Sequence, residues 1–119
     1  MKVILAIMGA VLFGSAYADV STAQKPEVEH LINFVKNSSC EINRNGRFHK
    51  GNEAVSHIQK KYAYFRDKIN TTEEFIEYAA TKSTMSGKYY LVKCGKAEAV
   101  RTKEWLLNEL KSYRQKKRT

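Results

Sequence analysis

Residues 83–90, Ser-Thr-Met-Ser-Gly-Lys-Tyr-Tyr, bring together side chains that could recognise a partner. They offer hydroxyls, an amine and two phenols around one glycine. Exposed loops that a rigid scaffold holds are where binding residues concentrate. We therefore expect a binding surface on this segment, called the 83–90 loop below, with Ser83, Ser86, Gly87, Lys88 and Tyr90 as its candidate residues.

A catalytic alternative uses the same serines. A serine nucleophile needs a neighbouring base and donors for the oxyanion. Ser83 or Ser86 could act with His57 as base if the fold brings them together, which would make the protein a hydrolase. No G-x-S-x-G or S-x-x-K motif is present, so the residues favour a binding protein over an enzyme.

The histidines do not form a metal-binding pattern. His30, His49 and His57 include no pair at i and i+4, and both cysteines are expected to pair with each other. We expect neither a metal nor a cofactor. Lys60 and Lys61 stand beside Tyr62, Tyr64 and Phe65 in a basic and aromatic run, of which we assign Tyr62 and Phe65 to the core.

The first 18 residues have the layout of a secretory signal peptide. Lys2 precedes an apolar run over 3–14, and Ala16-Tyr17-Ala18 forms a cleavage site before Asp19. We expect an exported protein, periplasmic or secreted, with residues 19–119 as a single domain. No later segment is apolar enough to span a bilayer, so we do not expect an integral membrane protein.

The charge balance points to anionic partners. Lys and Arg number 21 against 12 Asp and Glu. Export excludes nucleic acid, so we expect an unknown envelope component or protein as partner. Part of the charge lies in a basic C-terminal tail, expected to be solvated and able to meet an anionic surface; it contains Lys111, Arg114, Lys116, Lys117 and Arg118.

The two cysteines constrain the fold. Cys40 and Cys94 are the only ones, and an oxidising compartment makes a disulfide between them the expected state. Asn45-Gly46 is typical of a type I′ turn, which predicts strands over 40–44 and 47–50. The aromatic and β-branched residues of 89–94 predict a third strand. If it runs antiparallel to the first, Cys94 falls beside Cys40.

Apolar periodicity predicts four helices, over about 26–37, 52–69, 72–81 and from 102 onward. The longest stripe is Val55, Ile58, Tyr62, Phe65 and Ile69. Residues 95–101 are interpreted as a connector, and Thr71 with Glu74 fits a capping box. The expected fold is α+β, with four helices on a small three-stranded antiparallel sheet and one disulfide.

Two resemblances follow from these residues. Ser86-Gly87 with Tyr90 looks like the S-G-x-x-Y motif of bacterial periplasmic lysozyme inhibitors, which suggests a lysozyme-inhibitor-like protein as a second alternative. More broadly, the chain resembles the YfeK-like family of small exported bacterial proteins, a domain of unknown function. That resemblance covers about residues 27–113, and it rests on Arg44-Asn45-Gly46, Ala54 with His57, Lys61-Tyr62, Phe75-Ile76, Ala80 with Lys82-Ser83, Ser86-Gly87-Lys88 with Tyr90, Cys94, and Trp105-Leu106-Leu107.

The family resemblance implies export and one compact domain, and it supplies no activity. It adds His57 and Lys61 to the candidate binding residues of the 83–90 loop. Our leading sequence-based prediction is a small exported binding module of unknown ligand, without enzymatic activity.

Overall fold

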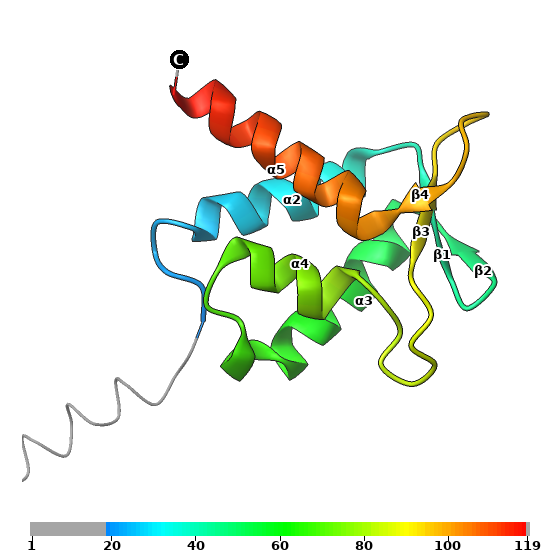
Figure 1. The fold of residues 1–119 in the computed structure, drawn as a ribbon, viewed down its shortest axis with the longest axis horizontal. Helices are drawn as coiled ribbons and strands as arrows, with labels where there is room; N and C mark the ends of the chain where they lie inside the picture. Colours follow the sequence, from blue (N-terminus) through cyan, green and yellow to red (C-terminus); the bar gives the residue numbers. More distant parts are fainter. Residues whose placement is uncertain (1–18, 119) are drawn as a thin grey trace, which may run out of the picture.

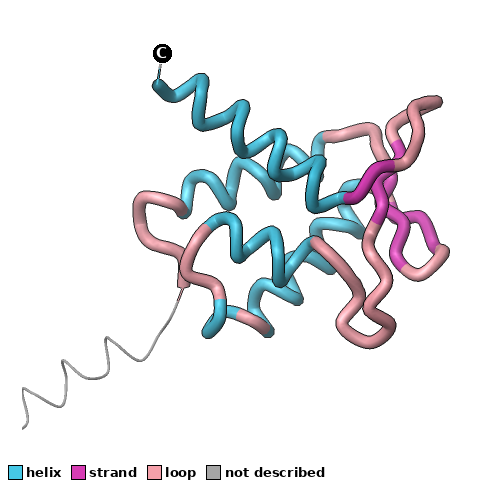
Figure 2. Tube along the Cα trace, viewed as in Figure 1, coloured by secondary structure: helices cyan, strands magenta, loops and turns pink. Residues whose placement is uncertain are grey.

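Helices and short strands follow one another along the chain, which the computed structural model describes over residues 19–118 (Figures 1 and 2). The predicted signal peptide, residues 1–18, lies outside the described residues. In chain order the elements are α2 (Lys25–Asn37), β1 (Glu41–Arg44), β2 (Arg47–His49), α3 (Gly51–Tyr64), a 3-10 turn (Arg66–Lys68), α4 (Thr72–Ala80), β3 (Leu91–Lys93), β4 (Val100–Arg101) and α5 (Thr102–Arg118).

The α+β prediction is confirmed, but the strand count was wrong by one. Within the described residues the sheet has four antiparallel strands in the order β2-β1-β3-β4. The extra strand is β4, from the segment that we interpreted as a connector. It pairs only Val100 with Val92 and Arg101 with Leu91. A two-residue strand is defined by its partner and is too short to show an alternating pattern.

The turn and disulfide predictions are confirmed. Asn45 and Gly46 have φ values of 54° and 87°, as a type I′ turn requires. In the β1–β3 ladder Glu41 lies opposite Lys93. The next residue out on each strand is a cysteine, and Cys40 is bonded to Cys94. The sheet register therefore brings the two cysteines together.

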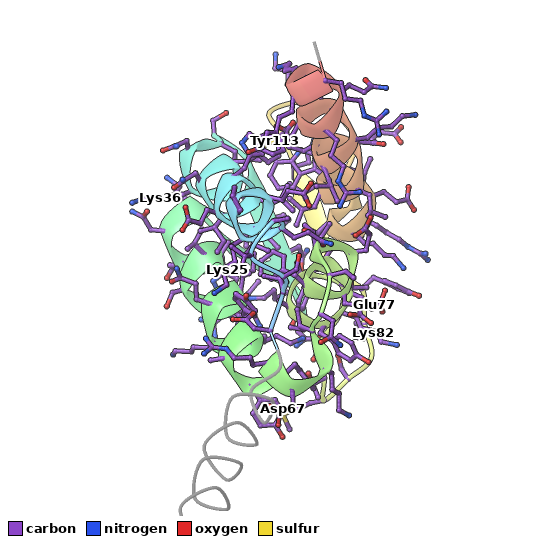
Figure 3. The ribbon with its side chains drawn as sticks, turned by 90° about the vertical axis from the view of Figure 1, so that its left-hand side faces the viewer. Lys25, Lys36, Asp67, Glu77, Lys82 and Tyr113 are labelled. Carbon is purple, nitrogen blue, oxygen red and sulfur yellow. A yellow bond between two sulfur atoms is a disulfide. The ribbon has the colours of Figure 1, made fainter. Side chains whose placement is uncertain are left out.

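The four helices pack together around the core, and the sheet lies at one end of this helical bundle (Figure 1). Figure 3 looks along them from the opposite end, with α2 beside α3, α4 beside α5, and side chains filling the space between. Neighbouring helices are in contact around this ring. Apolar side chains from all four are buried, among them Leu31, Ile58, Phe75 and Leu106. No helix within residues 19–118 combines the length and the apolar character that crossing a membrane would need.

Helix α3 is shorter than the stripe predicted. It ends at Tyr64, and a 3-10 turn carries the chain on to Ile69, which is fully buried. The chain bends there because α4 begins three residues later and must pack against α3. The predicted capping box is present: the Thr71 side chain accepts a hydrogen bond from the Glu74 backbone N–H at 3.1 Å.

Gly51 allows α2 and α3 to pack closely. A Cβ atom at this position would lie 2.5 Å from the backbone oxygen of Lys36 and 2.8 Å from that of Val35. Both atoms belong to the last turn of α2 and cannot move aside cheaply. Only glycine allows α3 to begin here, and this placement orients the helix that carries His57 and Lys61.

Helix α5 continues through the basic tail to Arg118. Arg114 is not a solvated tail residue, because its guanidinium holds two carboxylates. Its Nε and Nη2 donate to Glu27 of α2 at 2.8 and 2.9 Å, and its Nη1 donates to Glu73 of α4 at 2.7 Å. We call Arg114, Glu27 and Glu73 the three-helix clamp.

Candidate functional site

A groove of about 490 Å³ runs between α3, the 83–90 loop and the end of β1. Basic, hydroxylic, amide, aromatic and apolar side chains line it. They are Arg44, Asn45, His57, Lys60, Lys61, Tyr64, Phe65, Ser83, Thr84, Met85 and Tyr90. We call it the basic groove, because three of these residues are cationic and none is acidic.

The 83–90 loop is closed by its own backbone. The Ser83 N–H donates to the Lys88 carbonyl at 2.9 Å, and the Gly87 N–H donates to the Ser83 carbonyl at 2.9 Å. Gly87 has a φ of +75°, which glycine adopts without strain. The loop is therefore a preformed hairpin, and its exposed tip carries Met85.

The two loop serines tie the hairpin to the β1–β2 turn through Asn45. The Ser86 hydroxyl donates to the Asn45 side-chain oxygen at 2.7 Å. The Ser83 hydroxyl accepts from the Asn45 side-chain N–H at 3.4 Å and from the Ser86 backbone N–H at 3.2 Å. Both hydroxyls therefore serve to hold the loop against the sheet.

His57, Lys61 and Tyr90 meet inside the groove. The Lys61 ammonium donates to the Lys82 carbonyl at 2.7 Å and to the Tyr90 hydroxyl at 3.3 Å. That hydroxyl lies 3.1 Å from Nε2 of His57. Because Lys61 can only donate, the phenol proton is free to point at an unprotonated His57. The three side chains thus form a short donor chain that ends on a neutral imidazole.

The groove has a positive potential. Burial, followed by the charges of Arg44 and Lys61, lowers the pKa of His57 from 6.5 to about 4. Burial and Arg44 also lower the pKa of the Lys61 ammonium. Burial raises the pKa of the Tyr90 phenol, so the phenol stays protonated. Burial is the largest cause of all three pKa shifts, and the neighbouring cations add to it for His57 and Lys61 and oppose it for Tyr90.

The structure unites most of the site residues that the sequence suggested. His57, Lys61, Ser83 and Tyr90 line the basic groove, and Gly87 lines an adjoining hollow that shares Lys61 and Ser83 with it. Ser86 holds the loop from outside. Lys88 is exposed, and only its backbone contributes contacts to the loop.

Several residues that line the groove were not among the sequence-based candidates: Arg44, Asn45, Lys60, Tyr64, Phe65, Thr84 and Met85. Tyr64 is 79 % exposed and Met85 is 97 % exposed, and both line the groove. Phe65, which we assigned to the core, packs against the core but is only half-buried and also lines the groove. The basic and aromatic run at 60–65 was a usable signal for this wall.

The serine hydroxyls and His57 are engaged with different partners. Among the described residues neither serine hydroxyl is hydrogen-bonded to His57, whose partner is Tyr90. The part of the chain that the structure describes holds no cluster of three or more His, Cys, Asp or Glu side chains able to ligate a metal ion.

Comparison with known proteins places the chain among relatives without an assigned activity. The model of a family described as "Family of unknown function (DUF5329)" matches residues 22–114. The chain is also similar to a protein described as "Uncharacterized protein YfeK" from Salmonella typhimurium strain LT2. The two are 32% identical over 90 residues, which cover 75% of each. No solved structure gives a significant match. These findings confirm the resemblance to YfeK-like proteins.

Proposed function

This chain belongs to the family of unknown function DUF5329, and within it we propose that it acts as an exported, non-enzymatic binding module whose site is the basic groove. One observation carries the proposal: three cations and an exposed apolar rim surround a preformed groove that contains no acidic side chain. Unmatched charge beside exposed apolar surface is typical of recognition sites.

The hydrogen bonds of the groove support binding over hydrolysis. Ser83 and Ser86 engage Asn45, and His57 engages Tyr90, so neither serine has a base in contact. The hydrolase alternative therefore has less support. The lysozyme-inhibitor alternative is a special case of a binding module, and the exposed Ser86, Gly87 and Lys88 at the groove's edge are compatible with it.

The test is capture of a partner by the immobilised protein, with a bacterial envelope extract and purified lysozyme offered separately. The groove variant is Lys60→Gln/Lys61→Gln. The control is Lys36→Gln/Lys111→Gln, which removes the same charge from two exposed positions outside the groove. We expect the groove variant to lose at least about tenfold in captured partner, and the control to match the unmodified protein.

Circular dichroism and thermal melts of both variants show whether each is folded. If the folded groove variant captures as much partner as the control, the groove is not the binding site and the proposal fails. Saturable binding of lysozyme that the groove variant loses would identify the inhibitor form of the proposal.

A further inference from the structure

The cations of the basic groove form no ion pair with a carboxylate among residues 19–118. Five ion pairs are formed among the described residues, and none includes Arg44, Lys60 or Lys61. Lys61 bonds only to neutral groups, the Lys82 carbonyl and the Tyr90 hydroxyl. Like charges held together in a partly buried space repel, and an anion would relieve that repulsion.

Arg44 also has one nitrogen atom that lacks a hydrogen-bond partner. Its Nε is buried and has no hydrogen-bond partner. A buried donor without an acceptor carries a desolvation penalty that nothing offsets. The Nε edge of a guanidinium, with one terminal N–H₂ group, matches the two oxygens of a planar carboxylate. Arg44 lines the groove and also carries one buried N–H that lacks an acceptor among the described residues.

The rim of the groove is apolar. Tyr64 on α3 and Met85 on the 83–90 loop are among the most exposed large hydrophobic residues of residues 19–118. Both lie on the groove with Phe65, whose ring meets that of Tyr64 edge-on at 4.8 Å between centroids. Exposed apolar surface beside these cations would be covered by a ligand with an apolar body.

From these three observations we propose that the basic groove binds a small carboxylate that carries an apolar body. The carboxylate sits between Arg44 and Lys61, and the apolar body lies between Tyr64 and Met85. This inference rests on the proposed function and names its ligand class. A volume of about 490 Å³ lies within the range of small-molecule sites, and the concave shape suits one anion better than a flat charged surface.

Calorimetric titration with decanoate, below its micelle concentration, tests this directly. Acetate has the same carboxylate without the apolar body, and decanol has the apolar body without the charge. We expect decanoate to bind saturably with one molecule per chain. Acetate and decanol should each bind at least about tenfold more weakly, because each lacks one of the two contacts.

Two arginine variants locate the site. Arg44→Gln should weaken decanoate binding at least about tenfold, whereas Arg47→Gln should leave it unchanged. Arg47 lies opposite Arg44 in the β1–β2 ladder, is exposed and does not line the groove. Thermal melts confirm that both variants are folded. Met85→Ser, at an exposed loop tip, provides a second variant with little risk to folding and should also weaken binding.

The possible outcomes distinguish a failure of the proposed ligand class from a failure of the proposed binding site. Several decanoate molecules per chain, or equal binding by Arg44→Gln and Arg47→Gln, would overturn the carboxylate assignment. If decanoate does not bind but partner capture still depends on Lys60 and Lys61, the ligand class is wrong and the binding module stands. If neither decanoate binding nor capture depends on the groove, both proposals fail.

Discussion

Two regions of the protein each contain a central arginine, and they differ in whether that arginine is ion-paired. In the three-helix clamp, Arg114 holds Glu27 through two hydrogen bonds and Glu73 through another two. In the basic groove, Arg44 has no carboxylate within 4.0 Å among the described residues, and its Nε has no partner. The arginine of the clamp is ion-paired within the protein, whereas the arginine of the groove forms no ion pair among the described residues.

If the groove binds a ligand as proposed, this difference distinguishes a structural site from a binding site. The clamp joins α2, α4 and α5, and Thr72 donates a further hydrogen bond to Glu27 at 2.6 Å. Its polar groups are satisfied, so an external ligand has little to add there. The groove retains one unsatisfied donor, Nε of Arg44, and three cations that form no ion pair among the described residues. The clamp and the groove both contain cations, and they differ in whether carboxylates of the protein pair with those cations.

The largest effect should come from breaking the clamp with Arg114→Met. Glu27, whose side chain is 13% exposed, would lose its charged partner. Hydrogen bonds to charged groups contribute about 1.5–3 kcal/mol, and solvent screening at the one-third-exposed Arg114 lowers that, so we expect a loss of about 2 kcal/mol in the free energy of unfolding. Urea denaturation at neutral pH measures it.

Lys111→Met is the matched control, because Lys111 is exposed on the same helix. Its stability should be close to that of the unmodified protein. The hydrogen bonds from Arg114 lower the pKa of both Glu27 and Glu73. Their contribution is therefore complete above the ordinary value of 4.5 and is lost as pH falls below it. The Arg114→Met difference should shrink under acid, and a difference constant down to pH 2 would argue against the clamp.

A smaller effect is expected from the same replacement in the groove, Arg44→Met. Removing an uncompensated cation and an unsatisfied buried donor is often neutral or stabilising, so the free energy of unfolding should change by no more than about 0.5 kcal/mol. The variant should nevertheless lose decanoate binding. Urea denaturation and calorimetry on one preparation check both. A loss of stability as large as that of Arg114→Met would show that Arg44 is structural, and the comparison would fail.

The contrast between the regions also explains what the sequence could and could not predict. The Asn45-Gly46 turn was predictable because it depends on two adjacent residues, and the Cys40–Cys94 pairing was predictable because these are the only two cysteines. Four helices followed from apolar periodicity. The β4 strand was missed because its two residues acquire their role only from pairing with β3.

Arg44 was not recognisable as a site residue for a related reason. It ends a short strand, and the groove residues around it come from α3 and from the 83–90 loop, distant in the chain. Whether a cation has a counter-charge is a property of the assembled fold. Arg114 shows the reverse error: in the sequence it looks like one more tail charge, and in the fold it is engaged with two carboxylates.

The smallest effect should be a titration seen by NMR at His57. Its pKa is lowered to about 4 by burial first and then by Arg44 and Lys61. Because the folded pKa lies below the unfolded value of 6.5, the unfolded state binds more protons between those values, and His57 lowers stability as pH falls from 6.5 toward 4. The chemical shift of the imidazole resonance, assigned with His57→Gln, should titrate near pH 4, and at a higher pH in Arg44→Met.

Bound decanoate should also raise the pKa of His57, because its carboxylate offsets the neighbouring cations. A resonance that titrates near 6.5 in the free protein would mean that the groove is neither buried nor positive, and the contrast with the clamp would lose its electrostatic basis.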